Sequence, residues 1–396
     1  MLKRRREIFF LTSFRDLDAF YNANKELLVL FVKEFKKIFI VNSDNLRNFY
    51  KKLDYIKKPQ YNLPKEIQFI NHKNCNKFHK FCKFKNPLVI NNIGRGFEFF
   101  RLLFFIRRRN IPQIIIGNVG NIQFSTYYWH RINLKIFILF FSKFLPRIIS
   151  RIFVNLRIFN PIDIRFVSNK MIYNQFIEKK KNIINVPGYF KELVLVKSKI
   201  FDNFNRYKND SSEKHILFLE MQPEYFAMEE ISILNKKLVN EHYILLNKFL
   251  SNISRKLQRK VIISIHPLYN FNKAQSRFSA FKVIRMKTKE LIKSAYLIIF
   301  YDSSAILHAL MLRKKIICLR ADLFKGRKFN SDIYKDLCDL KFLHIKNKLN
   351  FNKKNFINDL NRRTEFYSKY LKTYMSSDLP LPGTQSVIET IKKKFF

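Results

Sequence analysis

Short runs of large apolar residues recur along the first half of the chain, each bounded by polar or turn-forming residues. Residues 8–11 form the first run, residues 18–35 show apolar positions at helical spacing, and residues 38–41 form a second run. Apolar runs of this length predict buried strands, and a strand, a helix and a strand in this order are typical of a βαβ unit. Further buried strands are predicted at residues 87–90, 113–117 and 165–168.

The second half of the chain repeats this alternation more regularly. Strands are predicted at residues 215–220, 261–266, 296–300 and 315–319, and helices at residues 232–257, 288–294, 305–312 and 385–394. Because parallel strands need helical crossovers, we expect an α/β protein with two doubly wound, Rossmann-like domains that face one another across a cleft. The polar segment 203–214 reads as a linker, so the predicted domains are residues 1–205 and residues 213–396.

The charge of the chain is unusual. Its formal net charge is +46, whereas its apolar content of 47% is ordinary for a globular protein. Lys, Asn, Ile and Phe are abundant while Gly and Ala are scarce, a pattern that an AT-rich genome would impose and that accounts for many scattered lysines. Clustered arginines are less well explained in this way. We therefore expect a polyanionic partner, which could be nucleic acid, an anionic membrane surface or a phosphorylated substrate.

The ends and the cysteine content favour a cytoplasmic protein. The basic residues 1–6 lead into an apolar run that Arg15 and Asp16 close, which is too short for a secretory signal. No window is long and apolar enough to predict a spanning helix. Four cysteines in 396 residues do not make a disulfide scaffold, which favours a reducing compartment.

The segment Asp302-Ser303-Ser304 follows a predicted buried strand and precedes a predicted helix. Asp and Ser cap helices because their side-chain oxygens accept backbone N–H groups of the first turn. One interpretation is an ordinary cap without a ligand. The other is an anion site, since a helix start at the carboxyl edge of an open α/β sheet suits a nucleotide phosphate.

Three further loops follow predicted strands of the second half and carry groups that can bind a ligand. The first contains Gln222, the second contains His266 and Pro267, and the third contains Thr288 and Glu290. Each alone has a structural explanation, since a His at a strand end is more often a hydrogen-bonding residue and a Thr before Glu more often a helix cap. In a doubly wound sheet, however, the loops converge on one crevice.

In this order the motifs resemble those of the GT-B glycosyltransferases of bacterial surface polysaccharide synthesis, and most of all the bacterial sialyltransferase-type families. The resemblance covers residues 215–320, and its motifs are Gln222-Pro223, His266-Pro267, Lys287-Thr288-x-Glu290-Leu291, Ser303-Ser304 and Lys314-Lys315-Ile316-Ile317. It implies transfer of a sugar from a nucleotide-sugar, a CMP-sugar in those families, to a surface polysaccharide, such as capsule or lipopolysaccharide, or to a lipid-linked glycan.

The resemblance also implies roles for individual residues. His266 would contact the donor phosphate and act as a general acid toward it, Ser303 and Ser304 would bind the same phosphate, and Glu290 would hold a ribose hydroxyl. Gln222, Pro267 and Thr288 complete the expected donor-binding set. Fixed donors can stabilise the leaving phosphate, so neither a metal nor another cofactor is expected.

The catalytic base departs from that family, whose acidic pair followed by Gly is absent from this chain. Deprotonation of an acceptor hydroxyl needs a carboxylate or a histidine. Asp16 and Asp18, in the loop after the first predicted strand, are the candidates. The alternative is that they only begin a helix, where acidic residues are favourable.

Between Gly94 and Asn160, basic residues alternate with large apolar ones and Glu98 is the only acid. Such a pattern suits a helix in an anionic membrane interface, which a lipid-linked acceptor would require. The candidate surface residues are Arg101, Arg107, Arg108, Arg109, Lys143 and Arg147. The alternative is a buried core helix, and nucleic-acid binding lacks any recognised signature. The expected location is the inner face of the cytoplasmic membrane.

His72, Cys75, His79 and Cys82 have a spacing that could hold zinc, but interspersed lysines oppose a cation, so no metal site is predicted. Three alternatives to a glycosyltransferase stay open. They are a non-catalytic nucleotide-sugar or glycan-binding relative, a sugar-nucleotide epimerase of the same fold, and a basic nucleic-acid-binding protein.

Overall fold

The computed structural model divides into two compact units, each built on a parallel sheet. Unit 1 contains the described residues up to Asp202 and those from Met375 onward, and unit 2 contains those from Lys214 to Tyr374. The structure describes residues 7–12, 17–35, 37–42, 64–71, 87–92, 100–116, 149, 152–153, 156, 158–181, 190–202, 214–221, 236–266, 269–324 and 338–395.

The sheet of unit 1 has seven parallel strands in the order β3-β2-β1-β4-β5-β6-β7. Its strands are β1 (Glu7–Thr12), β2 (Lys37–Asn42), β3 (Ile67–Asn71), β4 (Leu88–Asn91), β5 (Gln113–Ile116), β6 (Ile162–Val167) and β7 (Phe190–Leu195). The described helices between them are α1 (Leu17–Glu34), α3 (Phe100–Arg108) and α5 (Lys170–Lys181), and a 3-10 turn, η5 (Lys199–Phe201), follows β7.

The central strands of unit 1 are apolar on both faces because helices cover both faces. Ile8 and Phe10 of β1 belong to the core cluster that contains residues of α1, whereas Phe9 and Leu11 belong to a second cluster that contains Ile106 of α3. Successive side chains of a strand point to opposite faces, so a continuous apolar run is what a doubly covered parallel strand requires.

The sheet of unit 2 has six parallel strands in the order β10-β9-β8-β11-β12-β13. They are β8 (His215–Leu219), β9 (Val261–Ile265), β10 (Lys282–Arg285), β11 (Ala295–Phe300), β12 (Lys315–Arg320) and β13 (Lys341–His344). The helices are α7 (Lys236–Leu257), α8 (Phe271–Arg277), α9 (Thr288–Lys293), α10 (Ile306–Met311), α12 (Lys353–Arg363) and α13 (Tyr367–Met375), with 3-10 turns η7 (Asp322–Phe324) and η8 (Thr364–Phe366).

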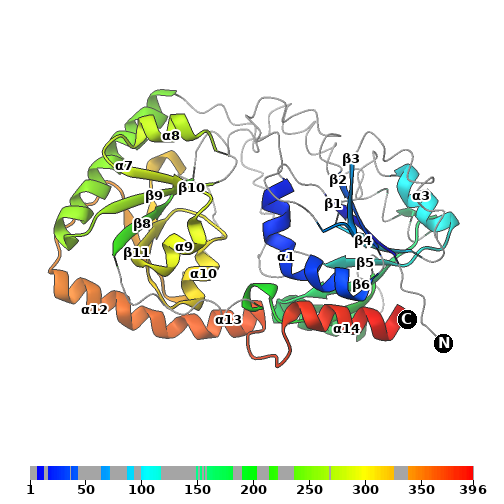
Figure 1. The fold of residues 1–396 in the computed structure, drawn as a ribbon. Helices are drawn as coiled ribbons and strands as arrows, with labels where there is room; N and C mark the ends of the chain where they lie inside the picture. Colours follow the sequence, from blue (N-terminus) through cyan, green and yellow to red (C-terminus); the bar gives the residue numbers. More distant parts are fainter. Residues whose placement is uncertain are drawn as a thin grey trace. The chain divides into compact units, whose positions relative to one another are not determined.

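The last helix, α14 (Gly383–Phe395), belongs to unit 1 and lies beside α1 (Figure 1). The assignment of all of residues 213–396 to a C-terminal domain is therefore wrong for residues 375–396. Asp202 accepts hydrogen bonds from the backbone N–H groups of Gly383 and Thr384 at 2.7 and 2.8 Å, which caps the helix. Only glycine fits at Gly383, because an added Cβ would lie 2.0 Å from the carbonyl oxygen of Lys197.

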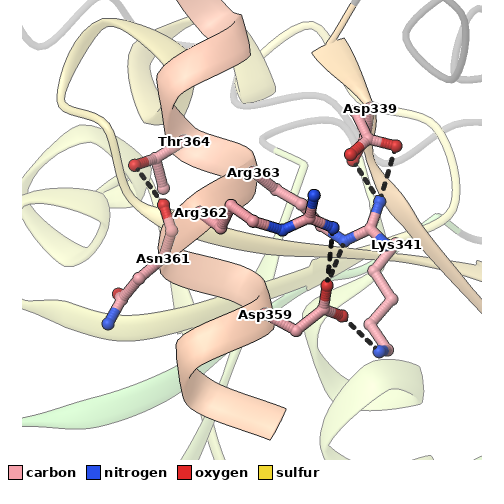
Figure 2. Close-up of polar contacts among 7 residues, drawn as sticks. All are labelled: Asp339, Lys341, Asp359, Asn361, Arg362, Arg363 and Thr364. Carbon is pink, nitrogen blue, oxygen red and sulfur yellow. Dashed lines mark hydrogen bonds and ion pairs between the residues drawn. The ribbon is translucent and has the colours of Figure 1, made fainter. Parts of the chain in front are cut away.

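A polar network fixes α12 to the chain before β13 (Figure 2). The Arg363 guanidinium donates to the carbonyl and to Oδ1 of Asp339, each at 2.7 Å, and to Oδ1 of Asp359 at 3.1 Å. Lys341 donates to the other oxygen of Asp359 at 2.5 Å. Asp339 has a positive φ of 47°, so the double contact of Arg363 holds a turn that a non-glycine residue rarely adopts.

The strands predicted in the second half are confirmed, with ends that shift by one residue, and the predicted strands of the first half are β1, β2, β4, β5 and β6. The elements missed from the sequence are β3, β7, β10, β13, α5, α8, α12 and α13, whereas α3 lies within residues 94–160, where a basic and apolar helix was expected. Within the described ranges, no helix combines the length and the apolarity that crossing a bilayer would need.

Candidate functional site

The topology of unit 2 brings the predicted donor loops to one edge of one sheet. β8 lies at the centre, β9 and β10 continue to one side, and β11 begins the other side. The carboxyl ends of β8 and β11 therefore flank the point where the strand order reverses. Open α/β sheets bind their ligands at this point.

Glu220, directly after β8, is a buried carboxylate at this point. Its side chain is 7% exposed, and the hydroxyl of Tyr243 from α7 donates to its Oε1 at 2.7 Å. Arg277 from α8 donates to the same hydroxyl at 3.2 Å and lies over the Tyr243 ring, 4.2 Å from its centroid. Buried carboxylates need such hydrogen bonds. The sequence places Glu220 in the first loop, but no motif distinguished it as a site residue.

His266 is exposed directly after β9. Its backbone carbonyl accepts a hydrogen bond from the N–H of Tyr269 at 2.9 Å, and the two rings lie 5.2 Å apart. Because Tyr269 is 7% exposed and belongs to the core of unit 2, it anchors the turn that presents the imidazole.

Thr288 begins α9, but its side chain does not cap that helix. The flanking residue is Lys287, which makes no side-chain cap, and the Thr288 hydroxyl is instead paired with the Ser264 hydroxyl of β9 at 2.8 Å. The expected Thr cap is therefore wrong, because a buried neighbouring hydroxyl competes for the same group. Glu290 is exposed on α9, as are Lys287 and Lys289.

The turn after β11 differs from the expected Ser cap. The residue flanking α10 is Ala305, in a helical conformation and without a side-chain cap. The Ser303 hydroxyl accepts from the Ala305 N–H at 3.3 Å, and the Ser303 carbonyl accepts from the Ile306 N–H at 3.2 Å. The Ser304 side chain is exposed. α9 and α10 each have six residues, so each has only a small helix dipole. An anion at this edge would therefore depend on hydrogen bonds from side-chain hydroxyls more than on a helix dipole.

Tyr301 holds this turn from below. Its side chain is 1% exposed, and its ring contacts those of Phe218, His242 and Phe324 at centroid distances of 6.0, 5.6 and 5.1 Å. Burial, together with the negative charge of Glu220, raises the pKa of Tyr301 well above its usual value. The phenol is therefore neutral and structural, and Asp302-Ser303-Ser304 follow directly from a rigid support.

His308 of α10 is a partly buried group beside the site. Burial, aided by the positive charge of Lys289 on α9, lowers its pKa from 6.5 to about 4. The imidazole is therefore neutral at physiological pH.

Several predicted residues are not placed. Asp16, Gln222, Pro267, Lys143 and Arg147 lie outside the described residues, as do the four candidate zinc ligands His72, Cys75, His79 and Cys82. Asp18 is in α1 and Arg101 in α3, but their side chains are not described. In the ranges that the structure does describe, no three His, Cys, Asp or Glu side chains gather as metal ligands.

The sheet edge thus combines an exposed imidazole, the exposed Ser304 hydroxyl beside the partly buried Ser303, an exposed carboxylate and two exposed lysines. Hydroxyls and cationic side chains suit a phosphate, and a carboxylate suits a sugar or ribose hydroxyl. The arrangement is chemically suited to a polar anion that carries hydroxyl groups, such as a nucleotide.

Comparison with known proteins identifies the fold. No protein-family model and no curated protein sequence matches the chain. Among solved structures, CalG4, the calicheamicin glycosyltransferase, is 9% identical, with a TM-score of 0.50 over 99% of this chain and 98% of that protein. The wall teichoic acid polymerase TagF is 11% identical, with a TM-score of 0.50 over 99% and 90%. The UDP-GlcNAc 2-epimerase of Methanocaldococcus jannaschii is 14% identical, with a TM-score of 0.53 over 98% and 99%.

These proteins are similar to this chain across almost its whole length, at identities that show the fold alone. The expected α/β class with two Rossmann-like domains is confirmed. The chain therefore has the GT-B fold, which includes both glycosyltransferases and sugar-nucleotide epimerases.

Proposed function

We propose that the protein is a glycosyltransferase that binds a nucleotide-sugar at the carboxyl edge of the unit 2 sheet. The observation that carries the proposal is the position of His266, Thr288 and Ser303, which follow β9, β10 and β11, parallel strands of one sheet whose order reverses between β8 and β11. The motif order favours a CMP-sugar as the donor. The proposed acceptor is a surface-polysaccharide or lipid-linked glycan.

The proposed roles follow from the chemistry of each group. Ser303 and Ser304 donate hydroxyl hydrogens to the donor phosphate, and His266 stabilises or protonates the same phosphate as the glycosidic bond breaks. Thr288 and Glu290 frame the nucleotide, with Glu290 accepting from a ribose hydroxyl. Asp16 or Asp18 removes the proton of the acceptor hydroxyl, and charge stabilisation by protein donors requires no metal.

The proposal includes the predicted location. A lipid-linked acceptor is presented at a membrane, so we place the protein in the cytoplasm, peripherally at the inner face of the cytoplasmic membrane. Gln222 and Pro267 remain part of the proposed donor-binding set by their positions in the sequence.

The test is nucleotide binding, measured by the thermal shift with CMP, CDP, UDP and GDP. We expect one of these to stabilise the protein, and we expect Ser303→Ala combined with Ser304→Ala to weaken its binding by at least about tenfold, since hydrogen bonds to charged groups contribute about 1.5–3 kcal/mol each. The matched control is Ser251→Ala with Ser254→Ala, which removes two hydroxyls from the last turns of α7, away from the carboxyl edge. Absence of stabilisation by every nucleotide would contradict the donor site.

Epimerases of the same fold provide the second candidate function, because a UDP-GlcNAc 2-epimerase is among the structural neighbours. The two reactions differ in their need for an acceptor. A transferase releases nucleotide when an acceptor glycan is added, whereas an epimerase changes the sugar stereochemistry with no acceptor present. A protein that binds nucleotide and does neither is the non-catalytic relative.

A further inference from the structure

The C-terminal part of α3 (cyan in Figure 1) contacts Phe153 and Phe159, which belong to a stretch of unit 1 in which the structure describes residues 152, 153, 156, 158 and 159. The ring of Phe104 lies 4.9 Å from that of Phe159 and 6.3 Å from that of Phe153, and the latter two lie 5.2 Å apart. Phe159 is 2% exposed and packs with Leu103, so the cluster has a buried base.

The outer side of this cluster is apolar and exposed. Phe104 is 44% exposed, Ile152 is 47% exposed and Leu156 is 63% exposed. The three side chains come from two chain segments that the phenylalanine rings hold together. They therefore form a patch whose shape does not depend on a single helix.

Arginines adjoin this apolar surface. Arg107, Arg108 and Arg109 are all exposed where α3 ends. Arg109 donates its backbone N–H to the carbonyl of Phe105, and Asn110, with a positive φ of 48°, closes the helix. No Asp or Glu occurs in the sequence between Glu98 and Asp163, so the charged residues of this stretch are all basic.

We infer that this surface, which we call the α3 patch (Phe104, Arg107, Arg108, Arg109, Ile152 and Leu156), docks on an anionic phospholipid bilayer. Arginines can contact lipid phosphates while exposed aliphatic and aromatic side chains enter the acyl boundary. Of the three exposed apolar side chains only Phe104 offers a ring for stacking on a base, and Ile152 and Leu156, the two more exposed ones, do not, which favours lipid over single-stranded nucleic acid.

The reason that we assign to membrane docking, access to a lipid-linked acceptor, rests on the proposed function. The binding itself can be measured without any transfer reaction. Vesicle binding and nucleotide binding are separate measurements on the same full-length protein, so failure of one is distinguishable from failure of the other.

The experiment is flotation of the protein with vesicles of phosphatidylcholine alone and of phosphatidylcholine mixed equally with phosphatidylglycerol. We expect binding to the mixed vesicles, weakened by salt. The variant Arg107→Gln/Arg108→Gln/Arg109→Gln should lower the partition by about 30–100-fold, from the effect of three basic residues near an anionic surface. Leu156→Ser should lower it by about tenfold through lost apolar insertion.

Matched controls separate the patch from net charge and general hydrophobicity. Lys354→Gln/Lys369→Gln/Lys372→Gln removes three exposed positive charges from α12 and α13, and Ile244→Ser removes a side chain of α7 that is 67% exposed. The controls should bind vesicles as the wild type does, and all variants should keep their nucleotide-induced thermal shift.

Three results would overturn the inference. They are equal binding to neutral and anionic vesicles, patch variants that bind no worse than the controls, and competition by an oligonucleotide with no effect of Leu156→Ser. The last would identify the arginines as a nucleic-acid surface instead.

Discussion

His308 shows how a single residue beside the proposed site can set the pH response of unit 2. It lies on α10, directly after the Asp302-Ser303-Ser304 turn, and burial together with Lys289 lowers its pKa from 6.5 to about 4. In the unfolded chain the imidazole regains its ordinary value. Between these two values the unfolded state binds a proton that the folded state does not, so stability falls as the pH falls.

We expect unit 2 to lose about 2 kcal/mol of stability through His308 between pH 7.5 and pH 5. The variant His308→Gln, which cannot take up the proton, should show a smaller loss over the same range in chemical denaturation. Ser304→Ala is the control, since it removes an exposed hydroxyl of the preceding turn and no titratable group, and should leave the pH dependence unchanged. An identical pH dependence in wild type and His308→Gln would contradict the assignment.

The roles of individual hydroxyls could not be predicted from the sequence. The pattern correctly placed Ser303 after a strand, because apolar runs and turn residues define strand ends, but it did not reveal β10, the strand before Thr288. It could not show that the Thr288 hydroxyl pairs with the hydroxyl of Ser264, which is distant in sequence. Nor could it show that the Ser303 hydroxyl accepts a hydrogen bond from the backbone N–H of Ala305, before α10 begins. Side-chain partners depend on the register of β9 with β10, which local sequence does not encode.

At the scale of elements, the network around Arg363 decides how firmly α12 is attached (Figure 2). Arg363 is 19% exposed and serves both Asp339 and Asp359, whereas the adjacent Arg362 is 62% exposed and contacts Asp359 at 3.4 Å. The two arginines thus share a helix, a charge and a carboxylate, but differ in burial and in the number of partners.

We expect Arg363→Leu to lower the free energy of unfolding of unit 2 by roughly 1–3 kcal/mol, since it removes the guanidinium that donates to Asp339 and one of the donors to Asp359. Arg362→Leu is the matched control and should cost less than about 0.5 kcal/mol, as an exposed pair does. Urea denaturation measures both. Equal losses from the two variants would show that the contacts of Arg363 add nothing beyond charge.

The difference between the two variants should depend on pH. Burial raises the pKa of Asp359, but the positive charges and hydrogen bonds of Lys341, Arg363 and Arg362 lower it by more. The pKa of Asp359 in the folded protein therefore lies below its ordinary value of 3.8. A depressed carboxyl pKa stabilises the fold above the unfolded value, and this contribution is lost as the pH falls through the folded value. The cost of Arg363→Leu should therefore diminish below about pH 4.

Among the elements, those with long or continuous apolar patterns were predictable and those without were not. The runs of β8, β9, β11 and β12 are buried at most of their positions, and sequence reasoning located them within one residue. β10 and β13 are edge strands whose residues are only partly buried, and α12 has many polar positions. A partly exposed edge strand does not require a continuous run of apolar residues. Its sequence of polar and apolar positions therefore resembles that of a loop.

At the scale of the whole molecule, the chain enters unit 1, forms unit 2 and returns to unit 1 through α14. Val387, Ile388 and Ile391 of α14 belong to the same core cluster as Ile8 of β1 and Phe31 of α1. The amphipathic pattern of residues 385–394 predicted a helix but could not indicate which core it would join. Asp202 and Gly383, which fix that choice, are far apart in sequence.

This topology predicts that buried residues of neighbouring C-terminal helices stabilise different units. Ile391 of α14 is fully buried in unit 1, and Leu360 of α12 is 1% exposed in the core of unit 2. Ile391→Ala and Leu360→Ala should each cost about 2–5 kcal/mol, because both leave a cavity in a packed core. Hydrogen exchange, read by mass spectrometry on peptides of β1 and β8, reports the two units separately.

We expect Ile391→Ala to accelerate exchange in β1 while β8 keeps its protection, and Leu360→Ala to produce the opposite pattern. The two variants serve as controls for one another, since each removes a similar buried aliphatic side chain from a C-terminal helix. If either variant accelerated exchange equally in β1 and β8, the units would unfold as one cooperative body. The return of α14 to unit 1 would then couple the two units energetically. Protonation of His308, or substitution of Arg363, would in that case lower the stability of unit 1 as well as that of unit 2.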